Sequence, residues 1–380
     1  MTRLRLFQSL LLIAFIFSSC APYETSSRQR AEKAEKAEGD IVIGIAWNTS
    51  AHEDLFVEGV TMAVDELNAK GGVLGRKVRT IICDDEASVS QGQAVAKKLA
   101  GNVDVVAVTG HANSDAAIPA SITYQYNGIV FVSPRATSPK LTKYGFPYVF
   151  RNIPSDQEIG RHLAKCAYDQ GLRRIVILDD RTEYGKGLAS IFGKECAEVG
   201  IEMVFHRSYH SWWNDFRRLI AEIKETEFDA VLLSGQLPLA AKVIKQFREM
   251  GVTAPFIGGD SLDSTELWDL TDGAAEGTIV ATVFNPHLAY GPTQQFKEDF
   301  FSKFQVYPDT WAAQGYDAIK VLAFTFEKCG STVPIVVSAF LRYVKDWHGV
   351  AGAYSFTQNG DIEGRPIHFK VLHDGKFQYL

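Results

Sequence analysis

Short apolar runs alternate with amphipathic patterns along most of the chain, from Ile41 onward. The runs show no polar alternation, and the segments between them carry apolar residues at helical spacing, as at Val57, Val60, Val64 and Leu67. Strands that are apolar on both faces, each followed by a helix, are typical of parallel sheets covered on both sides. The predicted strands begin near residues 41, 78, 103, 128, 173, 201, 228 and 254.

Glycines mark the ends of the predicted helices. Each stands between a helical pattern and the next strand, where it permits the left-handed backbone conformation that stops a helix. These positions are Gly71, Gly101, Gly128, Gly171, Gly200 and Gly251. Together with the apolar runs, they predict repeated βα units and therefore an open α/β sheet.

The alternation of strands and helices breaks twice, at residues 148–154 and 283–292. Two sheets joined by chain crossings explain these breaks better than one large sheet, so we predict an α/β fold with two doubly wound parallel-sheet lobes. Ligands of open α/β sheets bind beyond the carboxyl ends of the strands, which places the expected site in the βα loops. After the second break come helical patterns at 292–304, 310–329 and 333–344, and β-like segments near 353–356 and 366–372.

The N-terminus has the pattern of an export signal: basic residues, an apolar run from Leu10 to Phe17, and small residues before Cys20. A run of eight is too short to span a membrane, which takes roughly 20 residues. Cys20 is placed as in the lipobox of bacterial lipoproteins, which implies a lipid anchor, although an ordinary secretory signal is the alternative. We therefore predict a signal peptide at 1–19 and a lipidated tether at 20–39, with no apolar face to bury.

Composition and motifs argue against several classes of function. The 39 basic and 45 acidic side chains give a net charge of −6, so we expect no nucleic-acid partner. Cys83, Cys166, Cys196 and Cys329 have no metal-ligand spacing; four buried thiols, or a disulfide such as Cys166 with Cys196, both remain open. The chain contains no GxSxG, HExxH or Walker motif, and no GxGxxG that follows a strand and opens a helix. We therefore expect no enzyme, no cofactor and no metal site.

Six motifs in order carry a family resemblance over nearly the whole exported chain. They are DELNAKGGVLGRKV from 65, VSPRATSP from 132, GFPYVFRNIPSDQEIG from 145, EYGKGLA from 183, APFIGGDSLDS from 254 and DGAAEG from 272. In this combination the chain resembles the type I periplasmic binding proteins, specifically the Leu/Ile/Val-binding branch of ABC-transporter receptors. The resemblance implies two lobes joined by three hinge crossings, which close on a ligand.

The resemblance also implies a function and a division of the chain. We expect a monomeric extracytoplasmic protein, held at the membrane by its anchor, that captures a small polar metabolite, most simply an amino acid, and delivers it to an ABC permease. The alternative is a ligand-sensing subunit of a membrane signalling protein. The expected lobes are 40–154 plus 284–350 for lobe I, and 155–283 plus 351–380 for lobe II.

Four candidate binding residues lie in the predicted lobe I: Trp47, Ser114, Arg135 and Thr137. Ser114 is placed as the N-cap of a helix, an end that attracts anions, and the resemblance assigns it the ligand α-carboxylate; the alternative is a cap that serves only its own helix. The resemblance further implies that the main chain of Arg135 and the side chain of Thr137 hold the amino-acid moiety. Arg135 departs from the small residue usual there, and its side chain either grips a second carboxylate or points to solvent.

The remaining candidates complete the expected cleft. The resemblance implies that Tyr184 covers the ligand and that Asp260 pairs with its ammonium group, whereas helix-start packing and a turn aspartate are the respective alternatives. Gln236 stands where the branched-chain receptors often place an aromatic residue. Trp47 is a bulky residue in a shortened first βα loop. These two departures predict a side-chain pocket that differs from that of the branched-chain receptors.

Overall fold

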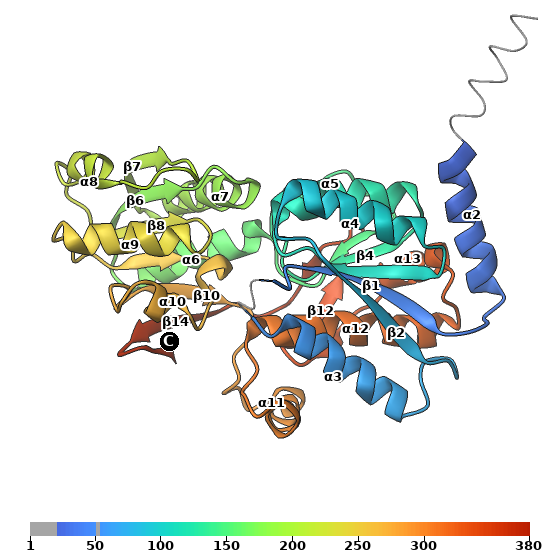
Figure 1. The fold of residues 1–380 in the computed structure, drawn as a ribbon. Coiled ribbons are helices and arrows are strands. Elements are labelled where there is room, and N and C mark those ends of the chain that lie inside the picture. The colour runs from blue at the N-terminus through green and yellow to red at the C-terminus, as the bar shows by residue number, and fades with distance from the viewer. Residues whose placement is uncertain (1–20, 51–53) are drawn as a thin grey trace, which may run out of the picture.

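The computed structural model describes residues 21–50 and 54–380, which form two lobes lying side by side (Figure 1). The predicted signal peptide at 1–19 and Cys20 lie outside the described residues, so the export signal and the lipid anchor stay predictions.

Lobe I contains a parallel sheet with the strand order β2-β1-β3-β4-β5. Its inner face packs on α3, α11, α12 and α13, and its other face on α4 and α5. The strands are β1 (Ile41–Trp47), β2 (Val78–Asp84), β3 (Val105–Gly110), β4 (Val130–Ser133) and β5 (Val149–Arg151). The helices are α3 (Phe56–Ala69), α4 (Val89–Gly101), α5 (Ser114–Tyr126), η1 (Pro139–Leu141), α11 (Gly291–Phe304), α12 (Thr310–Cys329) and α13 (Pro334–Leu341).

Lobe II contains a seven-stranded sheet with the order β15-β14-β10-β9-β8-β6-β7. The first five of its strands in the chain run parallel, while β14 and β15 add an antiparallel edge. The strands are β6 (Arg174–Asp179), β7 (Glu202–Ser208), β8 (Ala230–Ser234), β9 (Phe256–Gly258), β10 (Ile279–Thr282), β14 (His368–His373) and β15 (Lys376–Tyr379). The helices are α6 (Asp156–Asp169), α7 (Glu183–Val199), α8 (Arg217–Ile223), α9 (Leu239–Glu249), η2 (Asp260–Leu262) and α10 (Leu267–Leu270).

The two-lobed α/β architecture predicted from the sequence is confirmed. Each of the eight predicted strands lies within two residues of an observed one, and the helical pattern at 310–329 coincides with α12. Gly200 has a φ of 85° and caps α7 in the left-handed conformation, as expected. The expectation for Gly101 is wrong, because this residue ends α4 without a positive φ and Asn102 caps the helix in an extended conformation.

Within the described residues, no single helix is long and apolar enough to cross a membrane. Helices α12 and α13 together pass that test but are bent by 104° at the break between them. Most residues of α12 are buried in the core of lobe I, which accounts for its apolar character.

The segment predicted as a free tether is instead docked on lobe I. It forms α2 (Ala21–Glu35), which lies along the side of lobe I that faces away from lobe II (Figure 1). The fully buried Arg30 guanidinium donates hydrogen bonds to the carbonyls of Ala100, Val105 and Asn127 at 2.5–2.6 Å. Two of these carbonyls belong to the C-terminal ends of α4 and α5, where a cation is favoured. The expectation that this segment buries nothing is therefore wrong.

The expected boundary after residue 350 is also wrong. The short strands β11 (Trp347–Gly349), β12 (Gly352–Phe356) and β13 (Ile362–Glu363) form a separate antiparallel sheet. Tyr354, Phe356 and Ile362 belong to the same hydrophobic core as β1 and α12. The apolar side chains up to residue 362 therefore pack with lobe I, and the chain reaches lobe II at β14.

Buried polar groups connect the lobes near the chain crossings. In lobe II, the Asp263 carboxylate binds Lys370 and accepts a hydrogen bond of 2.7 Å from the Thr310 hydroxyl, at the start of α12 in lobe I. The Thr310 hydroxyl also lies 3.0 Å from that of Thr282, at the end of β10. Because the buried Asp263 and Lys370 pair with each other, neither ion is left without a partner at the crossings.

Helices α3 and α12 approach so closely that only glycine fits between them. A Cβ atom on Gly59 would lie 2.0 Å from the Ala312 carbonyl oxygen, so the backbone of α12 would have to move. We expect Gly59→Ala to destabilise the protein by about 1–3 kcal/mol, as overpacking does. Urea unfolding measures the change. Gly101→Ala is the matched control, because open space surrounds that position and alanine favours the helix; equal effects of the two substitutions would contradict the close contact.

Candidate ligand-binding site

A cavity of about 290 Å³ lies between the two lobes. The loops that follow the carboxyl ends of the parallel strands supply most of its wall, as expected for open α/β sheets. Lobe I contributes Asn48, Asp54, Ala87, Ala112, Asn113, Ser114, Arg135 and Trp311, and lobe II contributes Tyr184, Gln236, Leu237, Pro238, Asp260, Ser261, Ser264, Glu266 and Leu270.

Ser114 begins α5 at the cavity wall, but it is not the N-cap. Asn113 caps the helix, its side chain accepting a hydrogen bond of 2.9 Å from the Ala116 amide. The Ser114 hydroxyl oxygen accepts a hydrogen bond of 3.3 Å from the Ser138 amide, so its own proton can be donated to a ligand. A hydroxyl donor at the positive end of a helix suits a carboxylate.

Arg135 enters the cavity instead of pointing to bulk solvent, and its side chain is 22% exposed. Its Nη1 atom donates to Asp54 Oδ2 at 3.1 Å, and its Cζ atom lies 4.1 Å from the centroid of the Trp311 ring. The ion pair and the cation–π contact together hold the guanidinium against the lobe I wall.

Asp260, at the start of η2 in lobe II, lines the side of the cavity opposite lobe I. Its side chain is buried, and its Oδ1 atom has no hydrogen-bond partner among the described residues. Burial raises the pKa of Asp260 to about 7, while the positive charge of Arg135 acts in the opposite direction. Tyr184, also buried, covers this end of the cavity, and its hydroxyl oxygen accepts a hydrogen bond of 3.4 Å from the Ser261 amide.

A second buried carboxyl group, Asp156, belongs to the first turn of α6 but does not line the cavity. Burial, and then the negative charge of Asp260, raise its pKa to about 8. The buried Thr137 hydroxyl lies near Asp156 and acts in the opposite direction, lowering the pKa of that carboxyl group. Asp156 is therefore mostly protonated at neutral pH.

The structure brings five of the seven predicted residues to the cavity: Ser114, Arg135, Tyr184, Gln236 and Asp260. Their roles toward a ligand stay predictions. Two others are absent from the described cavity wall. Thr137 is fully buried beneath it, and Trp47 lies behind Asp54, stacked on Phe56 with a ring-centroid distance of 3.7 Å.

Asp54 and Trp311 line the cavity but were not predicted from the sequence as site residues. Asp54 lies within the shortened first βα loop, but an acidic residue in a loop carries no signal of its own. Trp311 follows Asp309, the N-cap of α12, and in the sequence it reads as one apolar residue of a helical pattern. Only the tertiary structure brings its ring within 4.1 Å of the Arg135 Cζ atom.

The lobes also touch at the rim of the cavity. The Glu183 amide, in the first turn of α7, donates to both carboxylate oxygens of Asp115 at 3.3 Å, across the gap to α5. Lys140 Nζ lies 2.5 Å from a carboxylate oxygen of Glu183. These contacts between the lobes show that the cleft is closed in this structure.

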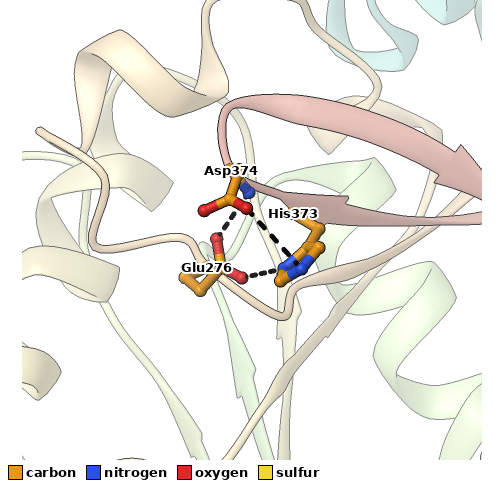
Figure 2. Close-up of side chains that lie close together, drawn as sticks. All are labelled: Glu276, His373 and Asp374. Atoms are coloured by element: carbon orange, nitrogen blue, oxygen red, sulfur yellow. Dashed lines mark hydrogen bonds and ion pairs between the residues drawn. The ribbon is translucent and has the colours of Figure 1, made fainter.

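A cluster far from the cleft has the composition of a metal site (Figure 2). Glu276 binds His373 through one carboxylate oxygen and accepts a hydrogen bond of 3.0 Å from the Asp374 amide through the other. Both oxygens of Glu276 thus already bind the β14–β15 turn, which explains the cluster without an ion. Cys83, Cys166, Cys196 and Cys329 are free thiols.

Two α/β lobes that close on a polar cavity, with buried connections at the crossings, are the architecture of a hinged binding protein. Residues 48–369 match the family model of the periplasmic binding proteins. The Leu/Ile/Val-binding protein homolog 1 of Brucella suis biovar 1 (strain 1330) is 30% identical over 349 residues, which cover 90% of this chain and 93% of that protein.

Solved structures agree. An ABC transporter substrate-binding protein from Desulfitobacterium hafniense, in complex with Leu, is 38% identical with a TM-score of 0.81, over 90% of this chain and all of that one. LivJ from Streptococcus pneumoniae str. Canada MDR_19A, in complex with isoleucine, is 25% identical with a TM-score of 0.82. The match covers 90% of this chain and 99% of LivJ. The chain therefore belongs to the type I periplasmic binding proteins, in the Leu/Ile/Val-binding family, and acts outside the cytoplasm.

The raised pKa of Asp156 predicts how stability depends on pH. Between about pH 4 and pH 8 the unfolded chain ionises this carboxyl group while the folded protein keeps its proton, so the free energy of unfolding falls as pH rises. Asp156→Asn removes the titration, and we expect a smaller loss of Tm between pH 5 and pH 8 than in the wild type. Thermal melts of the ligand-free protein measure it, with the exposed Asp169→Asn as control; identical pH profiles for all three would count against a protonated Asp156.

Proposed function

We propose that this protein captures an α-amino acid in the interlobe cleft and delivers it to the permease of an ABC transporter. The observation that carries the proposal is the placement of Ser114 and Asp260 on opposite lobes around one cavity. The hydroxyl and helix end suit the ligand carboxylate, and the buried carboxyl group suits its ammonium. The relatives from Desulfitobacterium hafniense and Streptococcus pneumoniae, bound to Leu and isoleucine, support this ligand class.

The proposed ligand also accounts for closure. In the closed structure Asp260 is 3% exposed, and a carboxylate removed from water is costly unless a cation joins it. An amino acid supplies that cation to lobe II and its carboxylate to lobe I. The ligand therefore bridges the lobes and stabilises the closed state over the open one.

We further propose that the protein acts by binding alone, without converting its ligand. The cavity wall offers hydrogen-bonding groups, one ion pair and aromatic surfaces, all suited to holding a zwitterion. Recovery of the bound amino acid unchanged after prolonged incubation, checked by mass spectrometry, supports this; a modified product would overturn it.

Substitution of Asp260 should weaken amino-acid binding more than substitution of Ser114. Asp260→Asn leaves the ligand ammonium buried without a counter-charge, and we expect a loss of about 2–5 kcal/mol. Ser114→Ala removes one hydrogen bond to a carboxylate that the helix end still supports, a loss of about 1.5–3 kcal/mol. Calorimetry on both variants measures the difference. An amino-acid ligand indifferent to Asp260→Asn would show that its ammonium lies elsewhere.

We propose that the exported protein is anchored through a lipid on Cys20, just before α2. Cys20→Ser removes the thiol that accepts the lipid, so fatty-acid labelling should be lost and the protein should appear as precursor or as soluble product. Cys329→Ser is the control, because this thiol lies at the end of α12 and should not affect labelling. Label retained on the Cys20→Ser protein would refute the anchor.

A further inference from the structure

One end of the cavity is built around the guanidinium of Arg135, and its orientation is fixed by a chain of contacts. Asp54 Oδ2 accepts the hydrogen bond from Arg135. Asp54 Oδ1 accepts hydrogen bonds from Trp47 Nε1 at 3.0 Å and from the Phe56 amide at 3.2 Å. With Trp311 against its planar face, Arg135 is a held group, not a flexible surface side chain.

We propose that Arg135 selects an amino acid with an uncharged side chain that carries an oxygen acceptor, a hydroxyl or a carboxamide. The inference rests on the proposed amino-acid function and extends it to the ligand side chain. Arg135 and its partner Asp54 line the same cavity as Ser114 and Asp260, the two residues proposed to hold the α-carboxylate and α-amino groups. A side chain that extends from those groups toward Asp54 meets the guanidinium.

A purely aliphatic side chain suits this end poorly. A guanidinium has five N–H donors, and the described protein residues accept one hydrogen bond from that of Arg135. Without a ligand, water can accept hydrogen bonds from the donors that face the cavity. A hydrocarbon side chain would displace that water without replacing its hydrogen bonds. Donors left buried in this way weaken binding by roughly 5- to 150-fold.

The charges argue against an ionised side chain. Asp54 already balances Arg135, and the ligand ammonium would balance Asp260. An anionic side chain would compete with Asp54 for the same guanidinium and leave one carboxylate unpaired in the cleft. A cationic side chain would face Arg135 itself. A neutral oxygen acceptor adds hydrogen bonds and no charge.

Calorimetry on the wild-type protein with threonine, glutamine, leucine, glutamate and lysine tests the inference. We expect threonine or glutamine to bind most tightly, with leucine, glutamate and lysine each weaker by at least about tenfold. Leucine, glutamate or lysine as the tightest ligand would overturn the inference while the proposed function stands. Binding of no amino acid would instead overturn the proposed function.

Two variants test the roles of Arg135 and Asp54 in ligand selection. Arg135→Met keeps the length of the side chain but loses its donors, so affinity for the polar ligand should fall and affinity for leucine should rise. Asp54→Asn keeps the Oδ1 acceptor for Trp47 and Phe56 but frees Arg135, so affinity for glutamate should rise by about tenfold or more.

Arg161→Ala is the matched control, because this arginine is exposed on α6 and pairs with Glu158 outside the cleft. Thermal melts of each variant confirm that it is folded. An unchanged order of ligand affinities in both Arg135→Met and Asp54→Asn would overturn the role of Arg135, even if a polar amino acid binds best to the wild type.

Discussion

The cleft depends on one electrostatic constraint: Asp260 is a carboxyl group that the closed structure removes from water. Burial raises its pKa to about 7, because the charged form has lost its hydration, and the positive charge of Arg135 only partly offsets this effect. In the proposed function, a ligand ammonium supplies the counter-charge for this carboxyl group. Under that proposal, closure and ligand capture are one process, in which the ligand completes an arrangement of charges that neither lobe completes alone.

Other buried charges near the chain crossings are paired within the protein. Asp263 and Lys370 pair in lobe II and reach Thr310 in lobe I, while Arg365 and Asp317 form a fully buried pair in lobe I. These charges have partners from the chain itself. Asp260 differs because its Oδ1 atom has no partner among the described residues, and in the proposed function the ligand provides one.

The fold was predictable because its signals are local. Apolar runs and helical periodicity predicted the strands and α12. The start of a helical pattern predicted Ser114, and two of the sequence motifs contain Tyr184 and Asp260. The docking of α2 was not predictable, since Arg30 is a charged residue in a low-complexity segment that buries itself only against the carbonyls at the ends of α4 and α5. The prediction that β12 and β13 belong to lobe II was wrong for a similar reason, because the residues they pack against in lobe I lie far away in the chain.

The sequence by itself determined the α/β class, the family and most of the residues at the carboxyl ends of the strands, because periodicity and motifs are properties of neighbouring residues. Only the tertiary structure decided that Arg135 enters the cleft, that Asp54 neutralises it, and that Thr137 and Trp47 lie behind the wall. Charge balance and burial depend on distances between residues far apart in the chain, and the packing of the folded lobes sets those distances.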